Sequence, residues 1–522
     1  MTGKNISAFI MGDQLNFDIS SLRDGPENVV MIESIKKCQS GKWHKRRIAF
    51  VISAMRHFGD ELKKKGYNVD YYRWAPDFTS ALREHVEKEG IKTLYVMKPK
   101  NHTAINYVSS LSSKLPAKVE VTENNQFMCP HEEFDRWLQG RKLPRLQHFY
   151  RMMRKTRDVL MDGNVPAGGV WTYERENRKS PPPCAQFPPP PEVKDDAVTG
   201  TAVQEVLDRF PDSYGELESL GMPVDRPGAI AWEEDFIRNK LPEYGPFEFA
   251  MESCSTTLFH SMTSPLLNAG LLSPHECVAM AVSAYEDGRA PISSVEGYVK
   301  RVMGWREYIA GMYGATAPGI LGYNYFDNRR HLPPLFEDES LTAMNCVWHT
   351  IRAIRETGYA NHSMRLMVLG NFALLAGIDP RELYDWFLKT NIDGCEWATA
   401  PNVICLSQYA DGGKVAMKPY VSSAGFINTM SDYCGKCHYD PDKKTGEDAC
   451  PFNYLYWNFI GSQQTYQIKN CRLTIPHREW EQAGPENKEA MEYEAEMFLD
   501  EIENPKKPGR ESETPSARST GA

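Results

Sequence analysis

Strand and helix patterns alternate through the first quarter of the chain, and helical patterns alone follow. Short apolar runs typical of buried strands occur at 8–12, 28–33, 69–74, 93–99 and 119–123. Helical periodicity separates several of these runs, at 46–66 and at 78–90. This alternation predicts an α/β domain with a doubly wound parallel sheet, which binds ligands at the carboxyl ends of its strands.

After residue 130 the strand signal fades. The segment 180–196 is rich in proline and cannot be helical. Beyond it, helical patterns occur at 198–210, 230–240, 274–287, 293–313, 342–357, 362–376 and 380–389. We therefore expect an α/β domain over 1–130, a connector with a basic helix and a proline-rich linker over 131–225, a large all-α domain over 226–505 and a disordered tail over 506–522.

Composition limits the class of protein. The chain has 522 residues, of which 41% are hydrophobic and 25% charged, as in ordinary globular proteins. It has no run of eighteen apolar residues and no signal-peptide pattern, so we expect a cytoplasmic protein without a membrane span. In that compartment the twelve cysteines are expected to be reduced, which favours metal binding over disulfides.

The net charge of −9 argues against nonspecific coating of nucleic acid, but one stretch is strongly basic. Between Arg136 and Arg157 there are eight Lys or Arg residues and no acidic residue. Interleaved aromatic residues make this stretch a candidate contact for DNA phosphates. A solvated helix face beside an acidic neighbour is the plainer alternative.

Three cysteines near the C-terminus have the spacing of a metal site. Cys434 and Cys437 form a CxxC turn, and Cys450 follows twelve residues later, directly before a proline. Zinc accepts four cysteines or three with a histidine, such as His438. An iron–sulfur cluster also takes four cysteines. The spacing alone leaves both metals open, as well as three unrelated buried cysteines, and the fourth ligand must come from elsewhere.

Several motifs occur in an order that resembles the photolyase/cryptochrome family. They are GDQL and SAMRHFGDEL near the N-terminus, then LFHSMTSPLLNAGLLSP (258–274), GYVKRVMGWREYIAGMY (297–313), TGYANHSMRLMVLGNFALLAGIDP (357–380), EWATAPNVICLSQYADGG (396–413) and KPYVSSAGFINTMSDYC (418–434). The resemblance covers residues 7–500 and is closest to the bacterial iron–sulfur branch. It implies FAD in the helical domain, a 6,7-dimethyl-8-ribityllumazine antenna in the α/β domain, and a 4Fe-4S cluster held by Cys346, Cys434, Cys437 and Cys450.

The resemblance also implies which residues contact FAD. They are His260, Ser261, Met262, Thr263, Ser264, Asn361, Arg365, Asp393, Cys395 and Thr399. Hydroxyl and backbone N–H groups at a helix start suit a pyrophosphate. Taken alone, the serine and threonine residues would be read as helix caps, Asp393 as a turn residue and Arg365 as a surface or paired arginine.

Four residues are expected to carry the photochemistry. His362 matches a histidine that adjoins the lesion in (6-4) photolyases and donates a proton, for which a pKa near the working pH suits it. Tyr420 and Trp305 match positions beside the lesion, where a flipped base needs flat apolar walls. Trp386 matches a tryptophan that relays electrons to the flavin. Without the resemblance, all four would be read as core residues.

The antenna is expected beside Gly12, Asp13, Gln14 and Glu33, which fall at strand ends and match the family pattern. Ordinary turn chemistry at strand ends is the alternative.

The sequence also departs from this branch. Asn361 stands where a histidine is usual, Thr399 replaces a glutamate near the flavin, and Phe387 replaces a redox-active tyrosine. Acidic residues near Glu337 and Asp338 take the place of a relay tryptophan. The implied activity is repair of (6-4) lesions in UV-damaged DNA by a monomer that associates with the nucleoid. The alternatives are a cryptochrome-like photoreceptor, whose signalling partner the sequence does not identify, and, less strongly, a cyclobutane-dimer photolyase.

Overall fold

A computed structural model describes residues 5–23, 25–184, 187–462 and 473–505 of the chain. The tail that the sequence predicts to be disordered, 506–522, lies outside the described residues. No described helix combines the length and apolar character needed to cross a bilayer.

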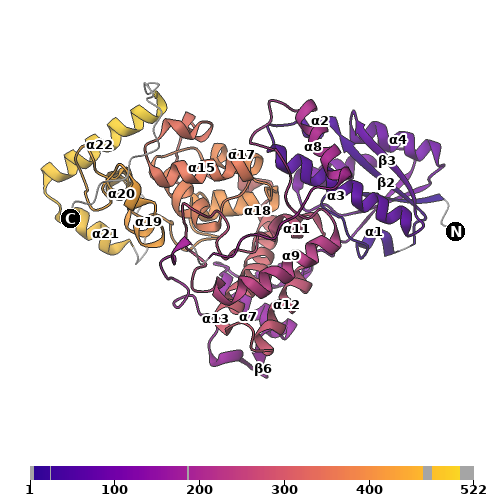
Figure 1. Ribbon diagram of the computed structural model, residues 1–522, viewed down its shortest axis with the longest axis horizontal. Coiled ribbons are helices and arrows are strands. Elements are labelled where there is room, and N and C mark those ends of the chain that lie inside the picture. Colours follow the sequence, from indigo (N-terminus) through magenta and orange to yellow (C-terminus); the bar gives the residue numbers. More distant parts are fainter. Residues whose placement is uncertain (1–4, 24, 185–186, 463–472, 506–522) are drawn as a thin grey trace.

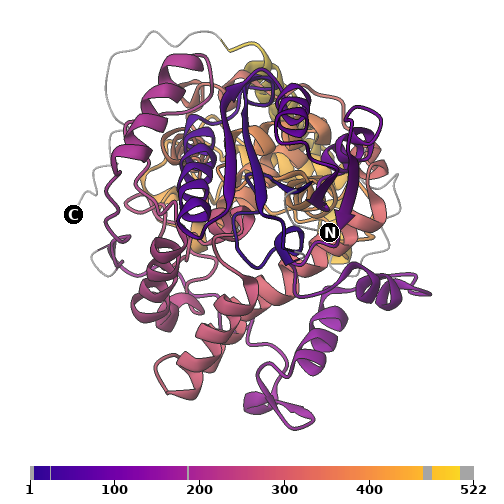
Figure 2. The ribbon, with the colours of Figure 1, turned by 90° about the vertical axis from the view of Figure 1, so that its right-hand side faces the viewer.

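A parallel sheet of five strands forms the N-terminal domain, as predicted (Figures 1 and 2). Its order is β3-β2-β1-β4-β5, which places β1 in the centre. The strands are β1 (Ile6–Ile10), β2 (Asn28–Ser34), β3 (Asn68–Ala75), β4 (Thr93–Met97) and β5 (Lys118–Thr122). Helices of this domain are α1 (Ser20–Arg23), α2 (Ile35–Cys38), α3 (Lys45–Lys64), α4 (Phe78–Lys88) and α5 (His102–Leu111).

Successive side chains of β1 point to opposite faces of the sheet, and each face has its own apolar cover. Ala8 and Ile10 join the core that contains α3. Phe9 joins a separate core formed with α4 and α5. Both faces of the central strand are therefore buried, which explains why the strands appear in the sequence as continuous apolar runs.

The helix at the end of the connector, α8 (Ala197–Arg209), packs against α3 of the sheet domain. Arg56 of α3 donates to Glu205 at 2.5 Å, and Trp74 Nε1 donates to the same carboxylate at 2.8 Å. The helix pattern at 198–210 is confirmed, and its contacts tie the end of the connector to the first domain (Figure 1).

Helices make up nearly all of the rest of the chain. The connector has α6 (His131–Leu138), α7 (Leu146–Arg157) and a two-stranded hairpin of β6 (Met161–Asp162) and β7 (Val165–Pro166), which the sequence did not predict. The helical domain contains α9 (Arg226–Asn239), α10 (Leu241–Tyr244), α11 (Ser264–Ala269), α12 (Pro274–Glu286), α13 (Ile292–Val299), α14 (Glu307–Thr316), α15 (Asn345–Thr357), α16 (Asn371–Leu375), α17 (Pro380–Thr390), α18 (Glu396–Ala400), α19 (Gly425–Met430), α20 (Pro451–Ser462), α21 (Thr474–Gln482) and α22 (Pro485–Glu503).

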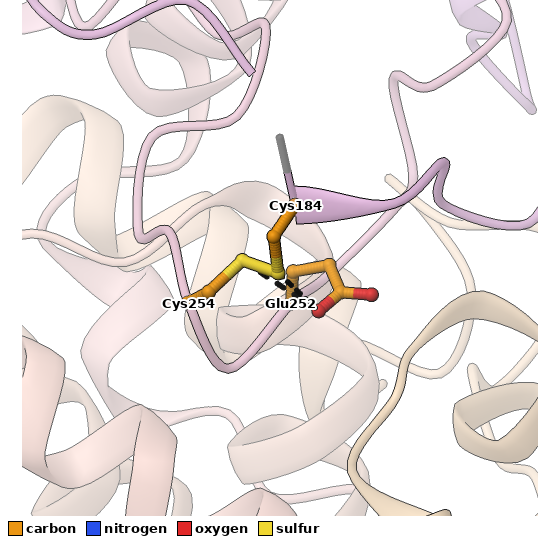
Figure 3. A group of neighbouring side chains, drawn as sticks. All are labelled: Cys184, Glu252 and Cys254. Carbon is orange, nitrogen blue, oxygen red and sulfur yellow. Dashed lines mark hydrogen bonds between the residues drawn. A yellow bond between two sulfur atoms is a disulfide. The ribbon is translucent and has the colours of Figure 1, made fainter. Parts of the chain in front are cut away.

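One expectation about the cysteines is wrong. Cys184 in the proline-rich connector and Cys254 in the helical domain form a disulfide (Figure 3). The two residues are 70 positions apart and show no joint spacing motif, so only the folded chain brings them together. The other cysteines that the structure describes are free thiols.

Candidate functional site

A cavity of about 330 Å³ lies in the helical domain. Ten of the residues expected to bind FAD or substrate line it together: His260, Ser261, Met262, Thr263, Ser264, Trp305, His362, Arg365, Asp393 and Thr399. They come from segments up to 139 residues apart, so the fold assembles the site. A cavity with this mixed lining has the character of a cofactor or substrate pocket.

Three π-helical segments contribute to the walls of this cavity. They are η4 (Lys300–Arg306), η8 (Met364–Gly370) and η9 (Pro401–Ser407), and they are the π-helices of the described chain. A π-helical turn is less favourable than an α-helical turn and occurs frequently at functional sites. Its wider turn changes the direction of the side chains that follow it.

Arg365 and Asp393 form a two-point ion pair on the cavity wall. Arg365 Nη1 donates to Asp393 Oδ1 at 3.0 Å, and Nη2 donates to Oδ2 at 3.2 Å. Arg365 Nε donates to the carbonyl of Ala360 at 2.7 Å, which fixes the plane of the guanidinium. Ser264 Oγ donates to the same carboxylate at 2.7 Å. The pair is therefore rigid and joins the start of α11 to the wall.

The loop before α11 also carries the expected FAD residues. Its φ angle at Met262 is +54°, a left-handed value that is uncommon for a residue with a side chain. His260 has its ring nitrogens 3.0 Å from the carbonyl oxygens of Thr257 and Glu248. Burial lowers the pKa of His260, so the ring is neutral and donates to only one of these oxygens.

His362 lines the cavity and is half-buried. Burial, followed by the charges of Arg301 and Arg365, lowers its pKa to about 3. In this structure the imidazole is therefore neutral at pH 7. The expectation that its pKa lies near the working pH does not hold for the cavity as described.

The other expected residues take different positions. Trp305 Nε1 donates to Asn402 Oδ1 at 3.0 Å, which fixes the indole on the wall. Asn361 is buried and does not line the cavity: its Oδ1 accepts from Met364 N at 3.0 Å. Cys395 Sγ lies 3.4 Å from Asn268 Nδ2, also outside the lining. Tyr420 is half-buried against the core and is not among the lining residues.

Trp386 lies one aromatic ring away from the cavity. Its neighbour Phe387 lines the cavity, with 5.1 Å between the two ring centroids. Trp386 also contacts Phe336 at 5.0 Å and Tyr214 at 6.4 Å. Phe336 precedes Glu337 and Asp338, the segment in which related proteins have a relay tryptophan. In this chain Phe336 is therefore the residue of that segment that contacts Trp386. Tyr214 is an aromatic contact that the sequence did not reveal.

The four cysteines expected to hold the cluster line one small void. Cys346 is at the start of α15, Cys434 and Cys437 form a turn after α19, and Cys450 precedes α20. Among the described residues, no three of these Sγ atoms lie within 4.8 Å of one another. Tetrahedral zinc with Zn–S bonds of about 2.3 Å needs Sγ atoms about 3.8 Å apart. The wider spacing fits a larger group, such as an iron–sulfur cluster.

Of the residues expected at the antenna, Gly12, Asp13 and Gln14 follow β1, and Glu33 lies near the end of β2. A Cβ on Gly12 would lie 2.6 Å from Val51 of α3, so tight packing requires glycine there. Burial raises the pKa of Asp13 to about 6. Gln14 Nε2 donates to Met97 O at 3.0 Å, and its Oε1 has no hydrogen-bond partner among the described residues.

Glu33 is engaged within the protein. Both of its carboxylate oxygens accept from Arg56, at 2.7 and 3.0 Å. Tyr71 adds a third hydrogen bond at 2.9 Å. The side chain is buried, so these bonds satisfy it without a ligand.

The basic stretch forms α6, α7 and the loop between them. Six of its eight cationic residues are exposed: Arg136, Arg141, Lys142, Arg145, Arg151 and Lys155. Arg154 is buried and donates to the carbonyls of Val159 and Trp171. Tyr150 of α7 packs directly on Gly304 of η4, where a Cβ would lie 2.9 Å from the ring. The basic helix therefore rests on a wall of the cavity.

Sequence reasoning missed several residues of the site. Tyr298, Arg301 and Trp397 line the cavity, and Arg301 Nε donates to Glu248 at 2.5 Å. Behind the wall, Glu233 accepts from Tyr298 at 2.6 Å, and burial raises the pKa of Glu233 to about 7. No local sequence pattern indicates a buried carboxyl group such as Glu233. Trp397 could have been found, because it lies in the EWATA segment of a family motif.

Comparison with known proteins shows which family the chain resembles. The family model described as deoxyribodipyrimidine photo-lyase-related protein matches residues 8–221. The chain is 36% identical, over 95% of its length and 99% of the relative's, to a protein from Agrobacterium fabrum named (6-4) photolyase. An uncharacterised mimivirus protein, R852, is 29% identical over 34% of the chain.

Solved structures share the fold. A bacterial class III photolyase from Agrobacterium tumefaciens aligns with a TM-score of 0.58 at 15% identity and covers 95% of this chain and 98% of its own. A cryptochrome from Synechocystis also aligns with a TM-score of 0.58, at 14% identity, and covers 95% of this chain and 99% of its own. Sequence and fold lead to one conclusion: the chain belongs to the photolyase/cryptochrome family.

Proposed function

We propose that this protein is a light-driven DNA photolyase that repairs (6-4) pyrimidine–pyrimidone lesions. The observation that carries the proposal is that His362 shares one cavity with the Arg365–Asp393 pair and the 260–264 loop. The family relative named (6-4) photolyase supports the same lesion class.

FAD is the proposed cofactor, and the donors in the cavity fit it. Backbone and hydroxyl groups of 260–264 lie at the start of α11 and suit a pyrophosphate. The fixed guanidinium of Arg365 and the carboxylate of Asp393 suit the polar edge of a flavin. When bound and reduced, FAD supplies the excited electron for repair.

His362 is the proposed proton donor to the lesion. Its low pKa arises from burial and from the nearby cations Arg301 and Arg365. The negative charge of an anionic ligand in the cavity would counter the effect of these two cations and raise the pKa of His362. We infer that His362 becomes a competent acid only after anionic groups enter the cavity.

A 4Fe-4S cluster is the proposed occupant of the cysteine site. Cys346, Cys434, Cys437 and Cys450 would hold it, and a zinc ion is the less favoured occupant because of the Sγ spacing. The ligands join the start of α15 to the start of α20. The cluster would therefore fasten the last helices to the domain that forms the cavity.

A lumazine antenna is the proposed ligand at the carboxyl end of β1. Half-buried Asp13, whose pKa is raised, and the unpartnered Oε1 of Gln14 support a polar ligand there. Glu33 would act indirectly, because Arg56 occupies its oxygens.

The exposed cations of α6 and α7 are the proposed contact with the phosphates of UV-damaged DNA. We propose that the protein acts as a cytoplasmic monomer that associates with the nucleoid through this substrate.

A cryptochrome-like photoreceptor is the second candidate, and one observation favours it. Thr399 lines the cavity at the position where this branch usually has a glutamate. A threonine cannot act as a charge or proton partner. Phe387 between the cavity and Trp386 would also slow reduction of the flavin.

The test compares two lesions under blue light. The reduced protein, with flavin content measured by absorbance, is mixed with oligonucleotides that carry either one (6-4) lesion or one cyclobutane dimer. We expect restored thymines only from the (6-4) lesion and only in the light. Restoration of only the dimer, or of neither lesion by flavin-loaded protein, would contradict the proposal.

A further inference from the structure

Outside the cavity and the cysteine cluster, one group of reactive side chains has no assigned role. Cys184 and Cys254 form an exposed disulfide, and the carboxyl group of Glu252 lies beside it (Figure 3). Glu252 Oε2 is 3.7 Å from Cys184 Sγ and 3.9 Å from Cys254 Sγ. Both sulfurs are thus within reach of one carboxyl group.

We infer that Cys184, Cys254 and Glu252 form a thiol–disulfide exchange centre, with Glu252 as the proton carrier. An exposed disulfide is open to attack by a thiolate from solution. The leaving cysteine needs a proton at neutral pH, and a carboxyl group in contact with both sulfurs can supply it. A disulfide that serves only as a structural staple does not need this neighbour.

The surroundings of Glu252 favour a carboxyl group that holds its proton near neutral pH. The side chain is nearly buried, and burial followed by the charge of Asp432 raises its pKa to about 7. Lys436 faces the same group, and it donates to Asp432 at 3.1 Å. Ser253 N also donates to Asp432, at 2.8 Å.

The reaction balances with an external dithiol as reductant. One thiolate of the dithiol attacks a cysteine sulfur, the Cys184–Cys254 bond breaks, and a mixed disulfide forms. The released cysteine takes a proton from Glu252. The second thiol of the dithiol gives its proton to Glu252 and attacks the mixed disulfide. The dithiol leaves as a cyclic disulfide and the second cysteine takes a proton from water, so two electrons and two protons have passed to the cysteine pair.

The position of the centre gives the exchange a structural consequence. Ala250, beside Glu252, accepts from Asn361 Nδ2 at 3.2 Å, next to His362 of the cavity. On the other side, Met251 N donates to Met430 O at 2.8 Å, close to the cysteine cluster. The disulfide therefore ties the proline-rich connector to a segment that lies between the two proposed cofactor sites.

The test is alkylation mapping of the full-length protein. The protein is purified without reductant, reduced with dithiothreitol, freed of the reductant, and then treated with oxidised glutathione. Samples taken at each stage are quenched in acid, alkylated and mapped by mass spectrometry. We expect Cys184 and Cys254 to convert together from disulfide to two thiols and back. Cys184 and Cys254 thiols that do not re-form their disulfide with oxidised glutathione would overturn the inference.

Exchange rates at pH 7 test the role of Glu252. We expect Glu252→Gln to slow reduction by dithiothreitol by about tenfold or more, because the leaving thiolate loses its proton donor. The matched control is Glu192→Gln, an exposed glutamate of the same connector. Equal rates in the two variants would contradict the role of Glu252.

Zinc bound stoichiometrically to the reduced protein, and lost in Cys184→Ser, would overturn the inference and make the group a metal site. Alkylation mapping and the exchange rates do not depend on repair activity, so both tests remain valid if the proposed function fails.

Discussion

Arg365 and Asp393 are held face to face by two hydrogen bonds of 3.0 and 3.2 Å on the wall of the cavity. Ser264 donates to the same carboxylate at 2.7 Å. One carboxylate thus joins η8, α11 and the turn before α18. Its loss would affect both the shape of the cavity and its charge.

Replacing this carboxylate should release flavin. Asp393→Asn keeps the size of the side chain but leaves Arg365 without its charged partner. We expect the bound flavin per chain to fall by about tenfold, since charge-assisted bonds of this kind contribute more than about 1.4 kcal/mol. Absorbance of the purified protein measures the flavin content. Asp385→Asn, an exposed aspartate on α17, is the control and should keep its flavin.

His44 should make the protein sensitive to acid. Its Nδ1 accepts from Arg46 N at 3.1 Å, and its Nε2 lies 3.0 Å from the carbonyl of Ile354. These contacts require the neutral ring, and burial is the main reason that the pKa falls to about 4. Below pH 6.5 the unfolded chain takes up a proton at His44, whereas the folded chain does not until about pH 4. The free energy of unfolding should therefore fall across this window, by up to about 3 kcal/mol from His44.

Denaturant titrations at several pH values test this assignment. His44→Asn can still cap α3, but it cannot titrate. Its stability should be lower at pH 7 and should change less between pH 6.5 and pH 4 than that of the wild type. The same pH slope in both proteins would show that His44 is not the source.

Removing one cysteine of the cluster should remove the metal. Cys346→Ser is expected to lower the iron content from about four atoms per chain to near zero, because three thiolates do not complete the site. Metal analysis and the broad absorbance of iron–sulfur clusters measure the loss. The matched control is Cys38→Ser, a half-buried cysteine of the sheet domain. Zinc in place of iron in the wild type would refute the cluster assignment.

The exposed cations of α7 should contribute to DNA affinity. Neutralising Arg151 and Lys155 together should weaken binding of a lesion duplex and reduce the slope of log K against log salt by about 2. Fluorescence anisotropy at several salt concentrations measures both. Lys88→Gln on the distant α4 should leave the slope unchanged. A double variant with the wild-type slope would place the DNA elsewhere.

The sequence was most informative where patterns are local. The five strands and long helices such as α3 and α12 were predicted because each carries its own apolar period. The helices α20 and α22 were not among the predicted ranges. The π-helical segments η4, η8 and η9 were not, because a single wide turn leaves no periodic signal. Their effect is nonetheless large, since all three line the cavity.

Residues whose role depends on distant partners were harder to predict. The structure brings His260 and Arg365 of two separate motifs into one cavity, whereas Asn361 caps a helix start and Tyr420 lies outside the lining. The disulfide of Cys184 and Cys254 joins two segments without a shared motif. Such pairs become visible only when the chain is folded.

The most direct test of light-driven (6-4) repair through His362 compares the wild type with His362→Asn at equal flavin content. Both proteins are reduced, mixed with an oligonucleotide that carries one (6-4) lesion, and illuminated with blue light. Restored thymines are then counted by chromatography. We expect restoration by the wild type and none by His362→Asn. Restoration by both would contradict the role of His362, and restoration by neither would contradict the proposed repair function.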